Sequence, residues 1–158
     1  MLKLTGDFAP LARLVQRLDH PDSVLVSVSK VMAEETLDLI DEGFDEERDP
    51  YGKPWAPKQK PDGRKVLHGP SGRLKSGYHR THANADGYGA AAAVEYADHH
   101  QRPRHKRNVR GQFTGGKFGG LKRPRRMQVP DPKKGMPNEW GDRLAEAAME
   151  ALRTAYGK

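Results

Sequence analysis

Cysteine is absent from the 158 residues of this chain. The chain therefore has no disulfide framework, no thiolate nucleophile and no cysteine-ligated zinc. Hydrophobic residues make up only 35% of the chain, little more than the 31% that is charged. We therefore expect one domain with a modest core. No apolar run approaches the ~20 residues of a membrane helix, and the first residues lack the apolar region of a secretory signal. We predict no membrane partner and synthesis in the cytoplasm.

Charge is distributed unevenly along the chain, although the net charge is only +7. Residues 1–50 carry 12 acidic and 5 basic side chains, whereas residues 102–126 carry 10 basic side chains and no acidic one. The acidic and basic blocks are therefore predicted to form separate surfaces. The densest acidic face follows one predicted helix, at Glu34, Glu35, Asp38, Asp41, Glu42, Asp45 and Glu46.

Periodic apolar residues predict helices at both ends of the chain. A short helix is expected over residues 7–18 and a longer one over about residues 23–42. Asp22 or Ser23 is the expected N-cap of the longer helix, and Gly43 its C-terminal stop. A final helix is predicted over about residues 138–156. The apolar stripe of the longer helix comprises Val24, Val28, Val31, Met32, Leu39 and Ile40.

Turns and one β-hairpin are predicted between these helices. The stretch Asp49–Pro57 has the proline and glycine pattern of tight turns, and we expect Trp55 within it to plug the edge of the core. Residues 78–83 and 88–96 are the expected arms of the hairpin, joined by the turn residues of 84–87. The alanines of the second arm also have high helix propensity.

We divide this single domain into four regions by sequence. A helical N-terminal region covers residues 1–48, and a turn and hairpin region covers residues 49–100. A basic loop covers residues 101–126. The last region, residues 127–158, is predicted to contain a short strand near residues 127–129 and the C-terminal helix.

The basic loop has no hydrophobic period and is rich in glycine. Its cations suit phosphate contacts that release counterions, and Phe113 and Phe118 could stack on bases. The same cations could instead pair with the acidic surface of a neighbouring subunit, and both interpretations stay open. The ten cations are Arg102, Arg104, Lys106, Arg107, Arg110, Lys117, Lys122, Arg123, Arg125 and Arg126.

No catalytic, metal-binding or cofactor-binding set is evident in the sequence. No acidic residue completes a zinc site with His79, His82, His99, His100 or His105 at the spacing of metal ligands. The acidic pairs lie in one dense face, not in a pocket that would separate their pKa values. The serine elbow and the glycine-rich phosphate loop are both missing. We therefore predict that the chain is not an enzyme and binds no cofactor.

Four stretches of the chain carry a resemblance to known proteins. The first is Asp49-Pro50-Tyr51-Gly52-Lys53-Pro54-Trp55, and the second is Leu67 followed by Ser71-Gly72-Arg73-Leu74. The third is Tyr96-Ala97 followed by His100-Gln101, and the fourth is Pro124-Arg125-Arg126-Met127. In this order they resemble the virion-morphogenesis or tail-completion family of tailed bacteriophages. The residues that carry the motifs are Asp49, Pro50, Gly52, Trp55, Gly72, Leu74, Tyr96 and His100.

The resemblance implies an α+β subunit in which N-terminal helices and a C-terminal helix pack on a small, mostly antiparallel sheet. Such subunits form a ring, typically a hexamer, in the virion neck where the tail joins the DNA-filled head. The implied partners are further copies of the chain, tail-tube and head-closure or connector proteins, and the genomic DNA that passes through the lumen. Assembly would take place in the host cytoplasm. We expect residues 34–49 to meet basic residues of a neighbour, while part of the basic loop lines the lumen or grips an adjacent ring.

Two other classes of function remain open on the sequence alone. A small basic nucleic-acid-binding protein would use the basic loop for affinity, but it leaves the Trp55 turn and the acidic helix unexplained. A toxin-like enzyme or a nuclease would need a catalytic set, and none can be assembled from these residues.

Overall fold

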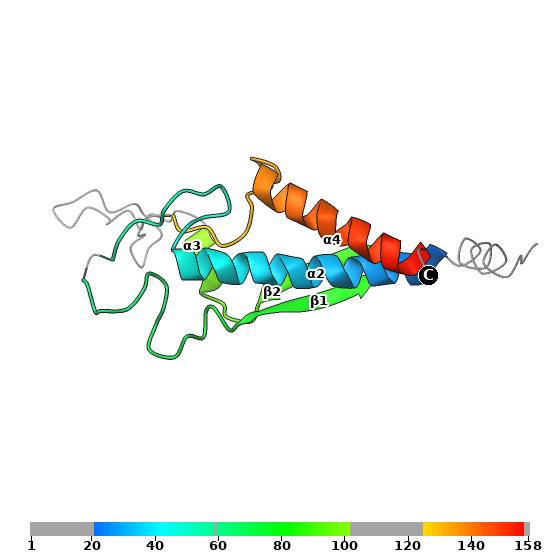
Figure 1. Cartoon of the computed structure of the whole chain (residues 1–158). Helices are drawn as coiled ribbons and strands as arrows, with labels where there is room; N and C mark the ends of the chain where they lie inside the picture. The colour runs from blue at the N-terminus through cyan, green and yellow to red at the C-terminus, as the bar shows by residue number, and fades with distance from the viewer. Residues whose placement is uncertain (1–20, 59, 102–124, 157–158) are drawn as a thin grey trace, which may run out of the picture.

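The computed structural model describes residues 21–58, 60–101 and 125–156, which form an α+β fold (Figure 1). The elements in chain order are α2 (Pro21–Glu46), β1 (Tyr78–Asn84), β2 (Gly87–Ala92), α3 (Ala97–Gln101) and α4 (Asn138–Tyr156). Helix α2 is the central layer: α4 packs on one side of it and the hairpin of β1 and β2 on the other. The predicted helix over residues 7–18 lies outside the described residues. No helix in the described part of the chain is long and apolar enough to span a membrane.

Helix α2 extends beyond both predicted ends. Asp22 and Ser23 lie within its first turn, and the helix continues through Gly43 to Glu46. The predicted stop was wrong because Phe44, one residue later, is completely buried and so keeps the chain helical. The helix ends instead at Glu46, and the next residue, Glu47, adopts a left-handed φ of 57°. There the amide of Arg48 donates a hydrogen bond of 3.1 Å to the carbonyl of Gly43.

The core lies at the end of the molecule where α2 stops. Phe44 is at its centre and meets the ring of Trp55 edge-on, with 5.4 Å between the ring centroids. One member of the predicted apolar stripe, Val31, is not buried, because it is 36% exposed. The prediction that it belongs to the buried face was wrong. The buried cluster consists of Leu39, Ile40, Phe44, Trp55, Val66, Leu74, Ala97, Trp140 and Leu144.

The hairpin is antiparallel and shorter than predicted. Its register pairs Tyr78 with Ala92 and Asn84 with Gly87, with an irregularity between Arg80 and His82. The Asn84 side-chain oxygen accepts hydrogen bonds of 3.1 Å from the amides of residues 86 and 87, which fixes the predicted turn. The alanines of β2 are strand, but residues 93–96, which were predicted to belong to this arm, leave the sheet and lead into α3, which the sequence did not predict.

Helix α4 has the predicted bounds and runs antiparallel to α2, with Trp140 and Leu144 buried against the core (Figure 1). The strand predicted near residues 127–129 does not form. No strand among the described residues pairs with this segment. Side chains of Trp55 and Gln101 bind its backbone instead, and Met127 and Gln128 are buried there.

Candidate interaction surfaces

Segments that are far apart in the sequence converge beside the core. The turn after α2, the end of α3 and the segment from residue 125 are joined by hydrogen bonds, and Leu74 lies in the same buried cluster as Trp55. We call the hydrogen-bonded region formed by residues 49–57, 100–101 and 125–131 the clamp. Each of the four motif stretches contributes at least one described residue to the clamp or to the core beside it.

The turn after α2 is organised by the carboxylate of Asp49, whose residue is 8% exposed. This carboxylate accepts hydrogen bonds of 2.9 Å from the amides of Tyr51 and Lys53. Pro50 is buried beside it, and Gly52 has a φ of 76° that a residue with a side chain would adopt only at a cost. The Asp49-Pro50-Tyr51-Gly52 motif therefore builds a rigid turn that presents Trp55 to the core.

Trp55 and Arg126 tie this turn to the later segment. The indole nitrogen of Trp55 donates to the carbonyl of Met127 at 3.0 Å. Arg126 donates in the other direction, to the carbonyls of Ala56 and Pro57, each at 2.9 Å. Its guanidinium is partly desolvated, which lowers the pKa of Arg126 from its ordinary value. Arg126 is therefore a structural cation in this fold.

Gln101 closes the clamp from the other side. Its carboxamide donates to the carbonyl of Val129 at 2.6 Å and accepts from the amide of Gln128 at 3.0 Å. The amide of Arg126 donates to the carbonyl of His100 at 3.0 Å. The chain thus leaves the clamp at Gln101 and re-enters it at Arg125, so that residues 102–124 start and finish at one place.

The predicted basic surface is divided by this arrangement. Arg125 donates to the carbonyl of Gln101 and pairs with Asp131, each at 2.8 Å, and this pairing holds the pKa of Asp131 below its usual value. Arg125 and Arg126 are therefore engaged by their own chain. The other eight predicted cations, between Arg102 and Arg123, lie outside the described residues.

Most of the predicted acidic face is also engaged within the chain. Arg143 of α4 binds Glu35 at 2.7 Å and Glu42 at 2.5 Å. Lys75 binds Asp45 at 2.7 Å. The remaining pairs join Arg48 to Glu46 and, at 3.6 Å, Arg80 to Glu34. Asp38 and Asp41 form no ion pair with another described residue, and both are exposed.

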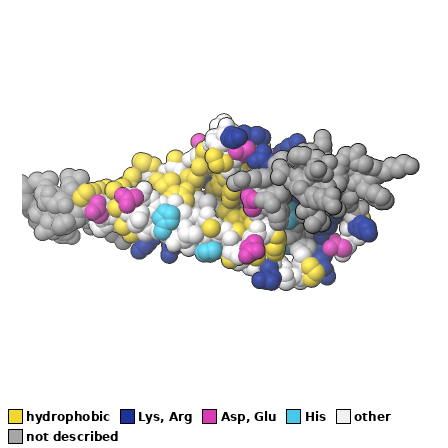
Figure 2. Space-filling model, turned by 180° about the vertical axis from the view of Figure 1, so that it is seen from behind, with side chains coloured by type: hydrophobic (Ala, Val, Ile, Leu, Met, Phe, Trp, Pro, Cys, Tyr) yellow, Lys and Arg dark blue, Asp and Glu magenta, His cyan; other side chains and the backbone are white. Residues whose placement is uncertain are grey.

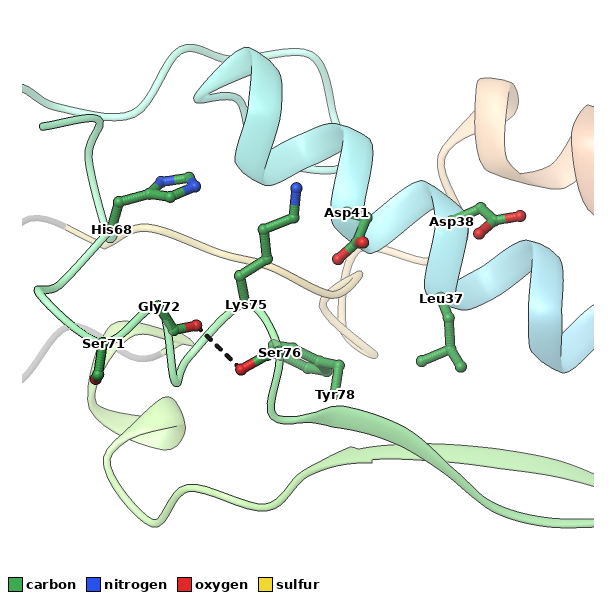
Figure 3. A pocket seen from close by; sticks show the side chains of 9 residues that line it. All are labelled: Leu37, Asp38, Asp41, His68, Ser71, Gly72, Lys75, Ser76 and Tyr78. Atoms are coloured by element: carbon green, nitrogen blue, oxygen red, sulfur yellow. Dashed lines mark hydrogen bonds between the residues drawn. The ribbon is translucent and has the colours of Figure 1, made fainter.

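A cavity of about 560 Å³ lies between α2 and the loop that precedes β1 (Figure 3). Asp38 and Asp41 line its helical side, and Lys75 extends toward α2 from the opposite side. Burial raises the pKa of Asp41, and the nearby carboxylates of Asp45 and Asp38 act in the same direction against the attraction of Lys75. The remaining lining residues are Leu37, His68, Ser71, Gly72, Ser76 and Tyr78.

The other motif residues have structural positions. Gly72 has a φ of 62°, and its carbonyl accepts from the amide of Ser76 at 3.2 Å and from its hydroxyl at 3.3 Å. Leu74 is 3% exposed in the core. Tyr96 is 42% exposed, and its ring meets that of His100 edge-on at 6.4 Å.

Hydrophobic side chains gather on the surface at the end of the molecule where α2 begins and α4 ends (Figure 2). Leu25 of α2 and Met149 of α4 are among the exposed ones, at 44% and 49%. In the part of the chain that the structure describes, no three histidine or acidic side chains form a group that could hold a metal ion.

Sequence reasoning missed Gln101, Lys75 and Arg143 as organising residues. Gln101 belongs to the third of the four motif stretches, so the sequence did carry a signal for its structural role. Lys75 and Arg143 act across long sequence separations, and nothing in their local sequence marks them. Comparisons with family models, curated proteins and solved structures gave no match to this chain.

Proposed function

We propose that this chain is a structural subunit of a phage virion neck, which acts in tail completion and head–tail joining as a ring around the DNA channel. The observation that carries the proposal is the clamp and the core beside it. Each of four short motifs that resemble the tail-completion family contributes residues here: Trp55, Leu74 and Ala97 lie in one core cluster, and Arg126 and Met127 are hydrogen-bonded to the Trp55 turn. This arrangement agrees with the resemblance.

Two features of the described surface support assembly with further copies. The core is small and lies at one end, while hydrophobic side chains are exposed at the other end. A small domain buries a smaller share of its surface than a large one, so contacts with neighbours add stability that it lacks alone. The proposal gives the chain no catalytic role.

The charge of residues 102–124 fits the same function. This segment carries eight cations and no acidic residue, and the described residues at its two ends belong to the clamp. Tight phosphate binding in a channel would slow the passage of DNA, so we assign part of these cations to protein contacts. This concentration of charge also favours the second candidate, a small nucleic-acid-binding protein, in which the clamp would present the cations to phosphates.

Size-exclusion chromatography with light scattering, recorded at protein and nucleic-acid wavelengths, distinguishes the two candidates. A nucleic-acid-free species of about six subunits, with a ring seen by electron microscopy, would support the neck subunit. A monomer that carries nucleic acid and sheds it steeply with added salt would support the second candidate and contradict the first.

A further inference from the structure

The cavity between α2 and the loop before β1 has an excess of negative charge that the described residues do not fully neutralise. Three aspartates stand along this part of α2, namely Asp38, Asp41 and Asp45. Lys75 also lines the cavity and attracts Asp41, but its ammonium group is bound at 2.7 Å to Asp45, which is not among the lining residues. Asp38 and Asp41 are left on the cavity wall without an ion pair among the described residues (Figure 3).

Other acidic residues of α2, unlike Asp38 and Asp41, form ion pairs with described residues. Glu34, Glu35 and Glu42 each bind an arginine of the same chain. The acidic face is therefore not a uniformly solvated surface: its unpaired part coincides with a hollow. Like charges close together destabilise each other, and a cation placed between Asp38 and Asp41 would remove this repulsion.

The walls of the cavity also fit the shape of a long basic side chain. Leu37 and Tyr78 supply apolar surface, and the carboxylates stand at the exposed side. Lysine and arginine bury their methylene stems along apolar surface while the charged group stays with polar partners. Phosphate and other anions are disfavoured here by the same carboxylates.

We propose that this cavity is a socket for lysine or arginine side chains from residues 102–124 of a second copy of the chain. This segment carries the complementary charge, with eight cations and no acidic residue. Its two ends are held by the clamp, so a neighbouring molecule would present it as a unit. The proposal rests on the proposed function, because it supplies the contact between adjacent subunits of a ring.

A site-specific cross-link tests which segment occupies the socket. The photoreactive residue benzoylphenylalanine replaces Leu37, and copies labelled with ¹⁴N and ¹⁵N are mixed before irradiation. Cleavage at acidic residues leaves 102–124 in one peptide, because that segment has no acid. We expect a mixed-isotope product between the Leu37 peptide and the peptide that contains residues 102–124. A product within one copy, a product with another peptide or no product would overturn the proposal.

A charge reversal gives a second readout. Asp38→Lys with Asp41→Lys should lower the mixed-isotope yield about tenfold or more, since like charges then face each other across the contact. The matched control is Asp86→Lys with Asp142→Lys, two exposed aspartates that form no ion pair among the described residues; it makes the same change in net charge and should keep the yield. Lysine is a good helix former, so neither substitution in α2 threatens that helix.

The same variants separate the two proposals. If Asp38→Lys with Asp41→Lys assembles into rings as the unchanged chain does, the socket is refuted and the neck subunit stands. If the unchanged chain stays monomeric at every concentration and binds nucleic acid, the neck subunit is refuted.

Discussion

One side-chain contact in the clamp can be tested directly, namely the hydrogen bond that the indole of Trp55 donates. Trp55 is 6% exposed and donates to the Met127 carbonyl at 3.0 Å. Trp55→Phe keeps an aromatic ring against Phe44 but removes the donor and part of the ring. Trp140→Phe is the matched control, since Trp140 is 5% exposed and its indole nitrogen forms no hydrogen bond with a described residue.

The two variants differ in one respect that can be given a magnitude. Each loses ring surface worth about 1–2 kcal/mol, by the value of roughly 0.8 kcal/mol for a buried CH₂ group. Trp55→Phe also leaves the buried Met127 carbonyl without its donor, which costs about 1–3 kcal/mol more. Trp55→Phe should therefore be the less stable variant by about 2 kcal/mol.

Urea unfolding followed by circular dichroism measures this difference, because both variants keep one tryptophan and the same helices. With a slope near 2 kcal/mol per M, the midpoint of Trp55→Phe should lie about 1 M below that of Trp140→Phe. Hydrogen exchange adds a local test: the amides of Gln128 and Val129, which both point to the Gln101 oxygen, should exchange faster in Trp55→Phe alone. Equal midpoints and equal exchange would refute the role given to the indole.

Three further predictions follow from other parts of the fold. Gly72→Ala should cost about 1–2 kcal/mol because Gly72 has a left-handed φ of 62°, while Gly69→Ala should be near neutral in the same thermal or urea assay. Arg143→Met should cost about 1 kcal/mol at low salt and less at high salt, and an equal cost for the exposed Arg153→Met would contradict the bridge to Glu35 and Glu42. Burial raises the pKa of Tyr78 from 10.0 to about 12, so the protein should lose about 2–3 kcal/mol relative to Tyr78→Phe as the pH rises from about 10 through 12; parallel stability curves for the two proteins would count against it.

Local patterns in the sequence predict the regular elements well and their ends less well. The bounds of α4 and the turn at Asn84 follow from apolar spacing and turn residues, and both are confirmed. Gly43 failed as a stop because the burial of Phe44 outweighs the low helix propensity of one glycine. Such burial depends on Trp55 and Leu74, which pack on Phe44 only in the folded chain.

Composition predicted which residues carry the charge of the candidate surfaces, but it did not predict the ion pairs and hydrogen bonds that these residues form. The acidic residues of α2 were predicted as one interface face, yet their partners Arg143 and Lys75 stand 101 and 30 residues from the acids they bind, at Glu42 and Asp45. Arg125 and Arg126 were grouped with the basic loop because of their neighbours in sequence. Their position in the clamp depends on carbonyl groups of Ala56, Pro57 and Gln101, and backbone carbonyls leave no trace in a sequence.

The clamp also makes residues 102–124 a candidate for modular exchange. The chain leaves the clamp at Gln101 and returns at Arg125, where hydrogen bonds among described residues hold the two ends of the 23 intervening residues together. Replacing them with a flexible linker of about six residues changes the entropy of loop closure by only about 1 kcal/mol. Natural variation in the length and charge of this segment could therefore alter what the subunit binds while the core stays the same. The position is equally suited to the insertion of a tag or a foreign binding peptide.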